Sequence, residues 1–490
     1  MSLRQQALSG VFWNSIQQFS HQIVSLIVSI ILARILLPSE FGLIAMISVF
    51  LSVGRRLLDA GLGQSLVRTT HLDEEDYSTV FFFNLIASLL IYLMIYLGAG
   101  NIAYFFSQPL LVEILRWYGI VFIINAFAII QSTKMTKEMD FKTQMKVSLP
   151  SVVLSGIVGI GMAVQGYGVW SLVGQGITQA LASAVQLWWY SSWRPKFIFS
   201  MDKLKLHFNY GFKLTLTGVI DTIFVNIYSI ILGRYFAVQQ LGYFQRADSL
   251  KQLPVTNISN VIEKVSFPLF AKIKDDDVKL RDVYKRILKL VTFIIAPTLL
   301  FMAVLAEPLI VLLFSEKWLP SVPYFQIICW AGILFPIHSY NLNILKVKGR
   351  TDLLLKLEIL KKVLIVVSLM IGFQFGITGI LYSSVAVSVL SFWINTHYTD
   401  KFINYSSRQQ ALDILPVILL AVLSSVAVYF INILLKDFLK YEILQLMIPT
   451  LVGIFIYLLI SKVLKFTALQ EILNILSSKN NSSFREDKVE

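Results

Sequence analysis

The feature that most constrains this chain is a series of apolar segments, each about 20 residues long, that recurs along nearly its whole length. A helix needs roughly 20 apolar residues to cross the hydrocarbon core of a bilayer, which is about 30 Å thick. Charged residues make up 14% of the chain, whereas soluble domains carry about 25%. We therefore predict an all-α integral membrane protein with about 14 transmembrane helices.

Charged stretches and stretches containing Gly or Pro separate these segments and set the expected helix boundaries. The predicted spans run over roughly 10–36, 41–66, 77–99, 109–133, 147–165, 168–190, 210–233, 240–268, 285–306, 318–346, 354–374, 377–399, 411–435 and 442–463. So many spans leave no room for a soluble catalytic domain, and we expect no enzymatic activity.

Lysine and arginine residues gather in alternate loops, and this sets the expected orientation, because cytoplasmic loops carry an excess of both. With the N-terminus inside, roughly 32 of the 42 basic residues fall on the cytoplasmic side. We therefore expect a bacterial cytoplasmic (inner) membrane protein with both termini in the cytoplasm. The net charge of +13 follows from this rule and from contact with membrane lipids, so nucleic acid is not an expected partner.

Residue counts exclude several kinds of site. The single cysteine, Cys329, rules out disulfides and Cys-based metal centres, and five scattered histidines disfavour an all-histidine site. The acidic runs at 275–277 and 71–76 are typical of solvated surface segments, and the glycines of 156–168 are typical of close helix packing or a tight turn. We expect no cofactor.

One segment of the sequence occurs a second time, 200 residues later. The sequence from Ile31 to Gly42 recurs from Ile231 to Gly242 without a gap. Spans 1–6 and 7–12 are thus predicted to be two copies of one unit in the same orientation, related by an axis along the membrane normal. The expected domains are two six-helix lobes at 1–200 and 201–405, a helix pair at 406–465 and a cytoplasmic tail at 466–490. Two-lobed parallel repeats are typical of alternating-access carriers.

Polar residues form one stripe on the first span and another on the seventh. At the offset of 200, His21 corresponds to Asp221. The two stripes should face a shared central cavity, where either group could carry a proton or pair with the other. A local hydrogen bond from each residue to a neighbouring helix is the alternative role.

Charged residues also interrupt three other spans. Such residues usually face a bundle interior or a water-filled cavity. An excess of cations would suit an anion such as a diphosphate, since arginine binds phosphate with paired hydrogen bonds. Structural pairing or snorkelling remains the alternative. The expected cavity cations are Arg55, Arg56, Arg246 and Lys251, with Asp59, Asp248, His338 and Asn341 as further polar groups.

Several short motifs, in this order, resemble one known family. They are the run 59–67 (Asp59, Gly61, Gly63), Leu253–Pro254, Phe267–Pro268, Tyr284, Pro297, Ala306–Pro308, Lys317–Trp318, Pro323 and Gly349–Arg350. Over about residues 8 to 465 the chain resembles the polysaccharide-transporter branch of the multidrug/oligosaccharidyl-lipid/polysaccharide exporter superfamily, and in particular Wzx-type lipid-linked oligosaccharide flippases.

This resemblance implies a V-shaped pair of six-helix lobes that moves an undecaprenyl-diphosphate-linked repeat unit to the outer leaflet. It implies cationic cavity residues that engage the substrate, coupling to a proton or sodium gradient or to the membrane potential, and a polyprenyl-tail groove at spans 13 and 14. The expected partners are the lipid-linked oligosaccharide, membrane lipids and other polysaccharide-assembly proteins. We expect a monomer.

Two alternatives remain open. A multidrug or cation antiporter of the same superfamily usually has twelve spans and acidic cavity residues. A membrane polysaccharide polymerase or ligase needs a sizeable external loop or a catalytic acid pair, whereas the predicted outer connections are short.

The charge distribution generates a topology prediction. A reporter fused after Lys205 or Lys279 should be cytoplasmic, and one within 98–108 should be external, because the basic loops stay inside. An external location for the loop 264–289 would overturn both the orientation and the assignment of two lobes.

Overall fold

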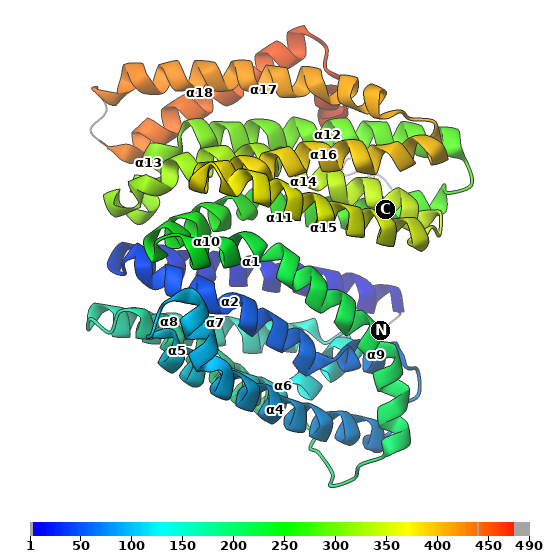
Figure 1. The fold of residues 1–490 in the computed structure, drawn as a ribbon. Helices are drawn as coiled ribbons and strands as arrows, with labels where there is room; N and C mark the ends of the chain where they lie inside the picture. The colour runs from blue at the N-terminus through cyan, green and yellow to red at the C-terminus, as the bar shows by residue number, and fades with distance from the viewer. Residues whose placement is uncertain (1–2, 439–440, 475–490) are drawn as a thin grey trace, which may run out of the picture. The chain divides into compact units, whose positions relative to one another are not determined.

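The computed structural model describes residues 3–438 and 441–474, apart from the side chains of residues 3–8, 11, 213 and 214. These residues are almost entirely helical and contain no strand, which confirms the all-α fold (Figure 1). The predicted tail is described only as far as residue 474, and its remainder lies outside the described residues.

The chain forms two compact units, Met1–Gln245 and Arg246–Glu490, whose boundary falls inside helix α11 (Val238–Lys272). The lobe boundary that the repeat predicts at residues 200 and 201 stays a prediction. The first unit contains α1 (Leu3–Ile35), α2 (Pro38–Asp59), α3 (Leu62–Arg68), α4 (Glu74–Phe106), α5 (Leu111–Tyr118), α6 (Ile120–Lys137), α7 (Phe141–Val164), α8 (Val169–Tyr190), α9 (Met201–Val225) and α10 (Ile227–Tyr235).

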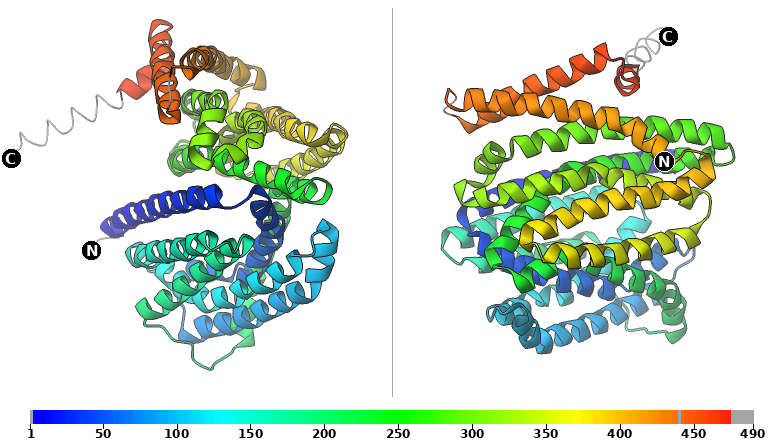
Figure 2. Two further views of the ribbon diagram at one scale, coloured as in Figure 1. Left: turned by 90° about the vertical axis from the view of Figure 1, so that its left-hand side faces the viewer. Right: turned by 45° about the horizontal axis from the view of Figure 1, so that its top comes forward.

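The second unit contains α12 (Asp277–Val304), α13 (Ala306–Phe314), the 3-10 helix η1 (Glu316–Ser321), α14 (Val322–Val347), α15 (Thr351–Phe373), α16 (Gly376–Ile403), α17 (Ser407–Lys436) and α18 (Glu442–Val463). Helix α12 packs against both α14 and α17, and α17 packs against α18 (Figure 2).

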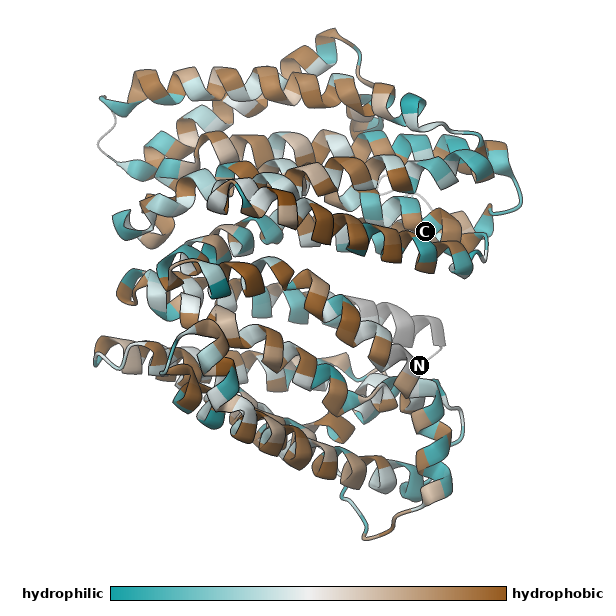
Figure 3. Ribbon diagram, viewed as in Figure 1, coloured by the Kyte–Doolittle hydropathy of each residue, from teal (hydrophilic) through white to brown (hydrophobic). Residues whose placement is uncertain are grey.

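Ten helical segments of the described chain are long and apolar enough to cross a membrane, and the α9–α10 pair, bent by 47°, would be an eleventh. Figure 3 shows hydrophobic residues along most of α17. The predicted number of fourteen is not confirmed. The other three predicted spans are helical but more polar, because glutamines interrupt α8 and charged residues interrupt α11 and α15.

A turn between α2 and α3 divides the predicted span 41–66, which is therefore not one helix. Ala60 and Gly61 have φ of 43° and 68°, in the left-handed region that a glycine adopts without strain. The Asp59 carboxylate accepts a hydrogen bond from the backbone N–H of Gly63 at 3.2 Å. A Cβ on Gly211 of α9 would lie 2.2 Å from the Ala60 carbonyl oxygen, so α9 rests directly on this turn.

The repeat reappears in the helix boundaries. Helix α1 ends at Ile35 and α2 begins at Pro38, while α10 ends at Tyr235 and α11 begins at Val238, again 200 residues later. A Cβ on Gly42 would lie 2.1 Å from the Val238 carbonyl oxygen, and one on Gly242 would lie 1.9 Å from the Pro38 carbonyl oxygen. This reciprocal contact is the pattern that a twofold axis produces.

A buried polar cluster fastens the start of α9 to α4. His207 and Asp76 are 0% and 1% exposed, and His207 Nε2 lies 3.1 Å from Asp76 Oδ1. His207 Nδ1 also bonds to Ser65 Oγ at 2.8 Å. A serine, a histidine and an aspartate in series resemble a hydrolase triad, but all three are buried, so no substrate reaches them. The cluster is structural.

The same cluster corrects one expectation from the sequence, since Asp76 of the acidic run 71–76 is buried instead of solvated. Lys203 Nζ lies 3.0 Å from both Asp73 and Asp76. Asp73 also accepts the backbone N–H of Asp76 as the N-cap of α4. That hydrogen bond, followed by the one from Lys203, lowers the pKa of Asp73 to about 2.

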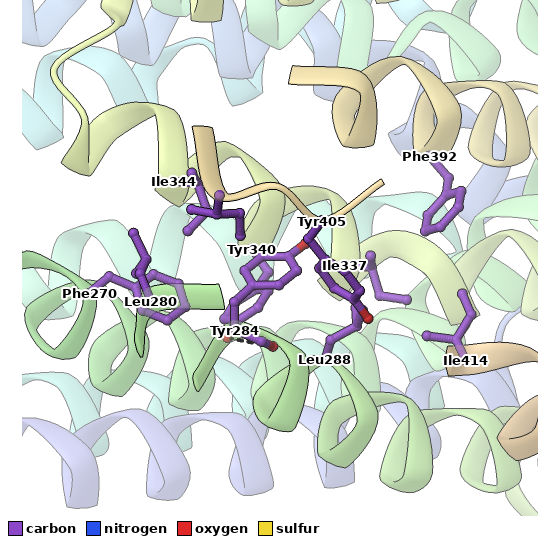
Figure 4. Packing of buried hydrophobic residues seen from close by; sticks show 11 residues of the cluster. Phe270, Leu280, Tyr284, Leu288, Ile337, Tyr340, Ile344, Phe392, Tyr405 and Ile414 are labelled. Carbon is purple, nitrogen blue, oxygen red and sulfur yellow. Dashed lines mark hydrogen bonds between the residues drawn. The ribbon is translucent and has the colours of Figure 1, made fainter. Parts of the chain in front are cut away.

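Tyrosine rings and their hydroxyl groups form the core of the second unit (Figure 4). The rings of Tyr284 and Tyr340 stack with their centroids 4.7 Å apart. The Tyr284 hydroxyl donates to Asn341 Oδ1 at 2.7 Å and lies 3.1 Å from Gln410 Oε1. These bonds join α12, α14 and α17 inside one unit.

The close packing of α9 on the α2–α3 turn generates a stability prediction. Gly211→Ala should destabilise the protein by about 1–3 kcal/mol, because the added methyl meets a backbone carbonyl that no rotamer change can move. The control is Gly98→Ala on α4, where a Cβ would meet nothing within 4 Å. Thermal unfolding in detergent, followed by tryptophan fluorescence, measures both. Equal melting temperatures for the two variants would contradict this packing.

Candidate functional site

The candidate site is a cavity of about 520 Å³ in the first unit, which we call the α2–α9 cavity. Residues on α2 at spacings of three and four lie on one face of the helix, and the same holds for α9. The two helices pack against each other, so these faces meet. The lining residues are Ser52, Arg55, Arg56 and Asp59 from α2 and Asp221, Thr222, Val225 and Asn226 from the end of α9.

The two arginines are the most informative groups of this cavity. Both are exposed, and neither forms a hydrogen bond or an ion pair with any residue that the structure describes. Arg56 reaches across to α9, where its Nε lies 3.7 Å from the position of a Cβ on Gly218. The guanidinium donors of Arg55 and Arg56 are therefore available to a ligand in the cavity.

Carboxylates balance these cations. Asp59 and Asp221 line the same cavity, so its formal charge is zero, which corrects the net positive charge that we expected. Asp59 is oriented by the Gly63 N–H. Neutralising either aspartate would leave a net charge of +1 beside Arg55 and Arg56, because the guanidinium groups stay charged. The net charge of the cavity thus depends on its two carboxylates.

A second cavity of about 500 Å³ shares Arg55 with the first, and we call it the α2–α6–α8 cavity. The sequence patterns did not indicate this cavity, because its polar residues come from four helices, α2, α5, α6 and α8, and each is unremarkable alone. The spacing of polar positions along α6 and α8 was the available signal. Its polar lining residues are Arg55, Tyr118, Asn125, Ser132, Thr133, Gln179 and Ser183.

Arg246, which we expected to line a cavity, is 7% exposed and packs among aromatic rings. Its guanidinium carbon lies 4.9 Å from the centroid of Phe314 and 5.4 Å from that of Trp318. A cation over aromatic faces is stabilised without entering a cavity. Arg246 therefore agrees with a structural role, which was the alternative to a role in a cavity.

The other expected cavity residues of the second unit also have local partners. Lys251 Nζ lies 2.5 Å from Asp248 Oδ1, one turn earlier on α11. His338 Nε2 lies 3.2 Å from Ser388 Oγ, and Asn341 belongs to the buried tyrosine network. None of the four lines the α2–α9 cavity.

His21 does not line the α2–α9 cavity, so the predicted pairing of His21 with Asp221 stays a prediction. His21 Nδ1 lies 3.4 Å from Ser25 Oγ on the same helix, whereas the alternative role was a bond to a neighbouring helix. Asp221 faces the α2–α9 cavity. Among the described residues no group of three or more His, Cys, Asp or Glu side chains could hold a metal ion.

The contrast between Arg246 and Arg56 generates a prediction. Arg246→Ala should lower the free energy of unfolding by about 2–4 kcal/mol, because it removes a desolvated cation–π contact and leaves a void. Arg56→Ala should change stability by less than about 1 kcal/mol, since its side chain faces a cavity. Thermal unfolding in one detergent compares the two. Loss of stability in Arg56→Ala alone would reverse these assignments.

Comparisons with known proteins agree with this geometry. Residues 31–323 match a family described as polysaccharide biosynthesis protein. The chain is 25% identical to the teichuronic acid biosynthesis protein TuaB of Bacillus subtilis (strain 168), over 72% of this chain and 73% of that protein. It is 26% identical to the lipopolysaccharide biosynthesis protein WzxC of Escherichia coli (strain K12), over 89% of each.

Solved structures show the fold. The lipid II flippase MurJ in an inward closed conformation matches with a TM-score of 0.75 and 15% identity, over 92% of this chain and 98% of that chain. An inward-facing multidrug resistance MATE family transporter of the MOP superfamily matches with a TM-score of 0.62 and 17% identity, over 81% of this chain and 99% of that chain. The two solved structures are those of a flippase and a transporter, not of enzymes. The chain is a multi-pass membrane protein that belongs to the polysaccharide biosynthesis protein family.

Proposed function

We propose that the protein flips an undecaprenyl-diphosphate-linked oligosaccharide from the inner to the outer leaflet of the bacterial cytoplasmic membrane by alternating access. The product would serve the assembly of a surface polysaccharide such as O-antigen, capsule or exopolysaccharide. The observation that carries this proposal is the pair Arg55 and Arg56, which face a cavity without a partner among the described residues. The family membership and the MurJ-like fold support it.

The diphosphate is the part of the substrate that fits the two arginines. A guanidinium group donates two parallel hydrogen bonds to phosphate oxygens, and adjacent guanidinium groups can engage both phosphates of a diphosphate. Hydrogen bonds to charged groups contribute about 1.5–3 kcal/mol each. Arg55 and Arg56 therefore supply both the charge and the geometry for this headgroup.

Asp221 gives the site a means of coupling to an ion gradient. Its carboxylate lines the same cavity as the arginines, so it would compete with the diphosphate for them. Protonation of Asp221 would remove that competition and leave a net positive charge. In this account Asp221 carries a proton inward on the return step, after the anion has been released outside, so that an inward-directed proton gradient drives export.

The second unit contains an apolar cavity that would bind the polyprenyl tail. An apolar cavity of about 440 Å³ lies between α12, α13 and α18, and its lining includes Phe293, Phe301, Leu446 and Leu458. Its walls would receive an isoprenoid chain through hydrophobic contact. Of the two spans to which the family resemblance gives the tail groove, α18 lines this cavity and α17 does not.

Further parts of the proposal concern context. Both termini lie in the cytoplasm, the protein acts as a monomer, and its partners are the lipid-linked oligosaccharide, membrane lipids and other polysaccharide-assembly proteins. The alternative is a multidrug antiporter, which the MATE fold permits. The guanidinium donors of Arg55 and Arg56 form no hydrogen bond with a described residue, and they favour an anionic substrate because phosphate oxygens accept hydrogen bonds and an ammonium group does not.

Loss of the arginines should abolish flipping. Arg55→Ala combined with Arg56→Ala should lower transport of a fluorescent undecaprenyl-diphosphate oligosaccharide in proteoliposomes at least tenfold, because charge-assisted hydrogen bonds are lost. Lysine at both positions should retain part of the activity, limited by loss of the paired hydrogen bonds. The control is Arg116→Ala, whose guanidinium lies over Tyr96 and outside this cavity. Full transport by the correctly inserted double variant would refute the site.

Asp221→Asn tests the coupling. It preserves shape and hydrogen-bonding capacity but removes the titrating group, so gradient-driven accumulation should stop while downhill exchange continues. Both modes are measured in the same vesicles. Equal loss of exchange and accumulation, or no loss of either, would remove Asp221 from the coupling step.

A further inference from the structure

The α2–α6–α8 cavity differs in chemistry from the cavity with which it shares Arg55. Apart from Arg55, every polar group that lines it is uncharged. Five of these side chains are amides or hydroxyls, and none of the five forms a hydrogen bond with another described residue. They are Asn125, Ser132, Thr133, Gln179 and Ser183.

All five are half-buried, so their polar groups face the cavity and can bind water or a polar ligand there. A lipid tail does not fit, because it cannot return these hydrogen bonds. A small inorganic ion does not fit either, since the only charge is Arg55 at the shared wall. Amides and hydroxyls, which donate and accept at once, are suited to the many hydroxyl groups of a saccharide.

An aromatic wall completes this set. A Cβ on Gly176 of α8 would lie 2.2 Å from Cε2 of Tyr118, so the ring packs directly on α8 where only glycine leaves room. Aromatic rings present an apolar face beside a polar tip, which suits the mixed C–H and hydroxyl surface of a sugar. From Val121 to Thr133 the lining residues follow α6 for about 18 Å at 1.5 Å per residue. The cavity is therefore elongated, as a chain of sugars is.

We propose that the α2–α6–α8 cavity is a saccharide subsite that holds the first sugars of the substrate while the neighbouring α2–α9 cavity holds the diphosphate. Arg55 lines both cavities and so lies at the junction between the phosphates and the first sugar. This inference rests on the proposed function. In this proposal Asn125 and Gln179 form hydrogen bonds with the sugar, and Arg55 and Arg56 bind the diphosphate.

The test compares lipids that differ only in the sugar. The probes are undecaprenyl diphosphate and the same lipid carrying one hexose, one N-acetylhexosamine or one disaccharide, with binding to the full chain in detergent followed by native mass spectrometry. At least one sugar-bearing probe should bind the unmodified protein more tightly than undecaprenyl diphosphate. Asn125→Leu combined with Gln179→Leu should remove this gain, by at least tenfold, and leave the affinity for undecaprenyl diphosphate unchanged.

The matched control is Asn84→Leu on α4. Like the Asn125 and Gln179 amides, the Asn84 amide forms no hydrogen bond with a described residue, but it is fully buried and lies outside both cavities. The Asn84→Leu variant should keep the full increase in affinity that the sugar gives. Its melting temperature shows whether removal of an amide destabilises the fold. Gly176→Ala, which displaces the Tyr118 ring, should lower the gain in the same way as the amide variants.

The outcomes separate the two proposals. A sugar-dependent gain that survives in the Asn125/Gln179 double variant, or no gain with any probe, would overturn the saccharide subsite alone. Failure of undecaprenyl diphosphate to bind, or binding that Arg55→Ala and Arg56→Ala leave unchanged, would instead overturn the diphosphate site of the proposed function. An equal loss for all probes in the amide variant would reassign those residues to the fold.

Discussion

A charged side chain inside a bilayer needs water, a counter-ion or an aromatic ring, because its insertion into hydrocarbon costs about 2.5–3.5 kcal/mol. This constraint separates the four cations that look alike in the sequence. Arg246 lies over two rings, and Lys251 forms an ion pair with Asp248. Arg55 and Arg56 instead line the α2–α9 cavity and form no hydrogen bond or ion pair with a described residue. The chemistry proposed for the protein follows from that difference.

Glycine contacts set where this cavity forms. The turn at Ala60 and Gly61 ends α2 just after its two arginines, and Gly211 allows α9 to lie against that turn. Asp221 is ten residues further along α9, which brings its carboxylate to the face that carries Arg55 and Arg56. The position of the proposed coupling group is thus fixed by backbone packing two to three turns away. The same turn accounts for two residues of the motif 59–63: Gly61 adopts the left-handed conformation, and Asp59 accepts the hydrogen bond from the Gly63 N–H.

The sequence was sufficient to predict those features of the fold that depend on local patterns. Apolar runs located the helices, and the offset of 200 residues predicted that α2 and α11 begin at equivalent positions, Pro38 and Val238. The left-handed pair at Ala60 and Gly61 was missed, because hydropathy continues through it. Contacts between distant segments, such as Asp76 with His207 or Arg246 with Trp318, depend on packing that no local pattern encodes. For this reason Arg246 and Lys251 were expected to line a cavity but have local partners instead. The α2–α6–α8 cavity was not predicted at all.

The central claim is that Arg55 and Arg56 bind a diphosphate in the α2–α9 cavity. Cryo-electron microscopy of the protein in lipid nanodiscs saturated with undecaprenyl diphosphate tests it directly. The account predicts density for the two phosphates within hydrogen-bonding distance of both guanidinium groups. Clear headgroup density elsewhere in the protein, with both arginines turned away from it, would contradict the claim.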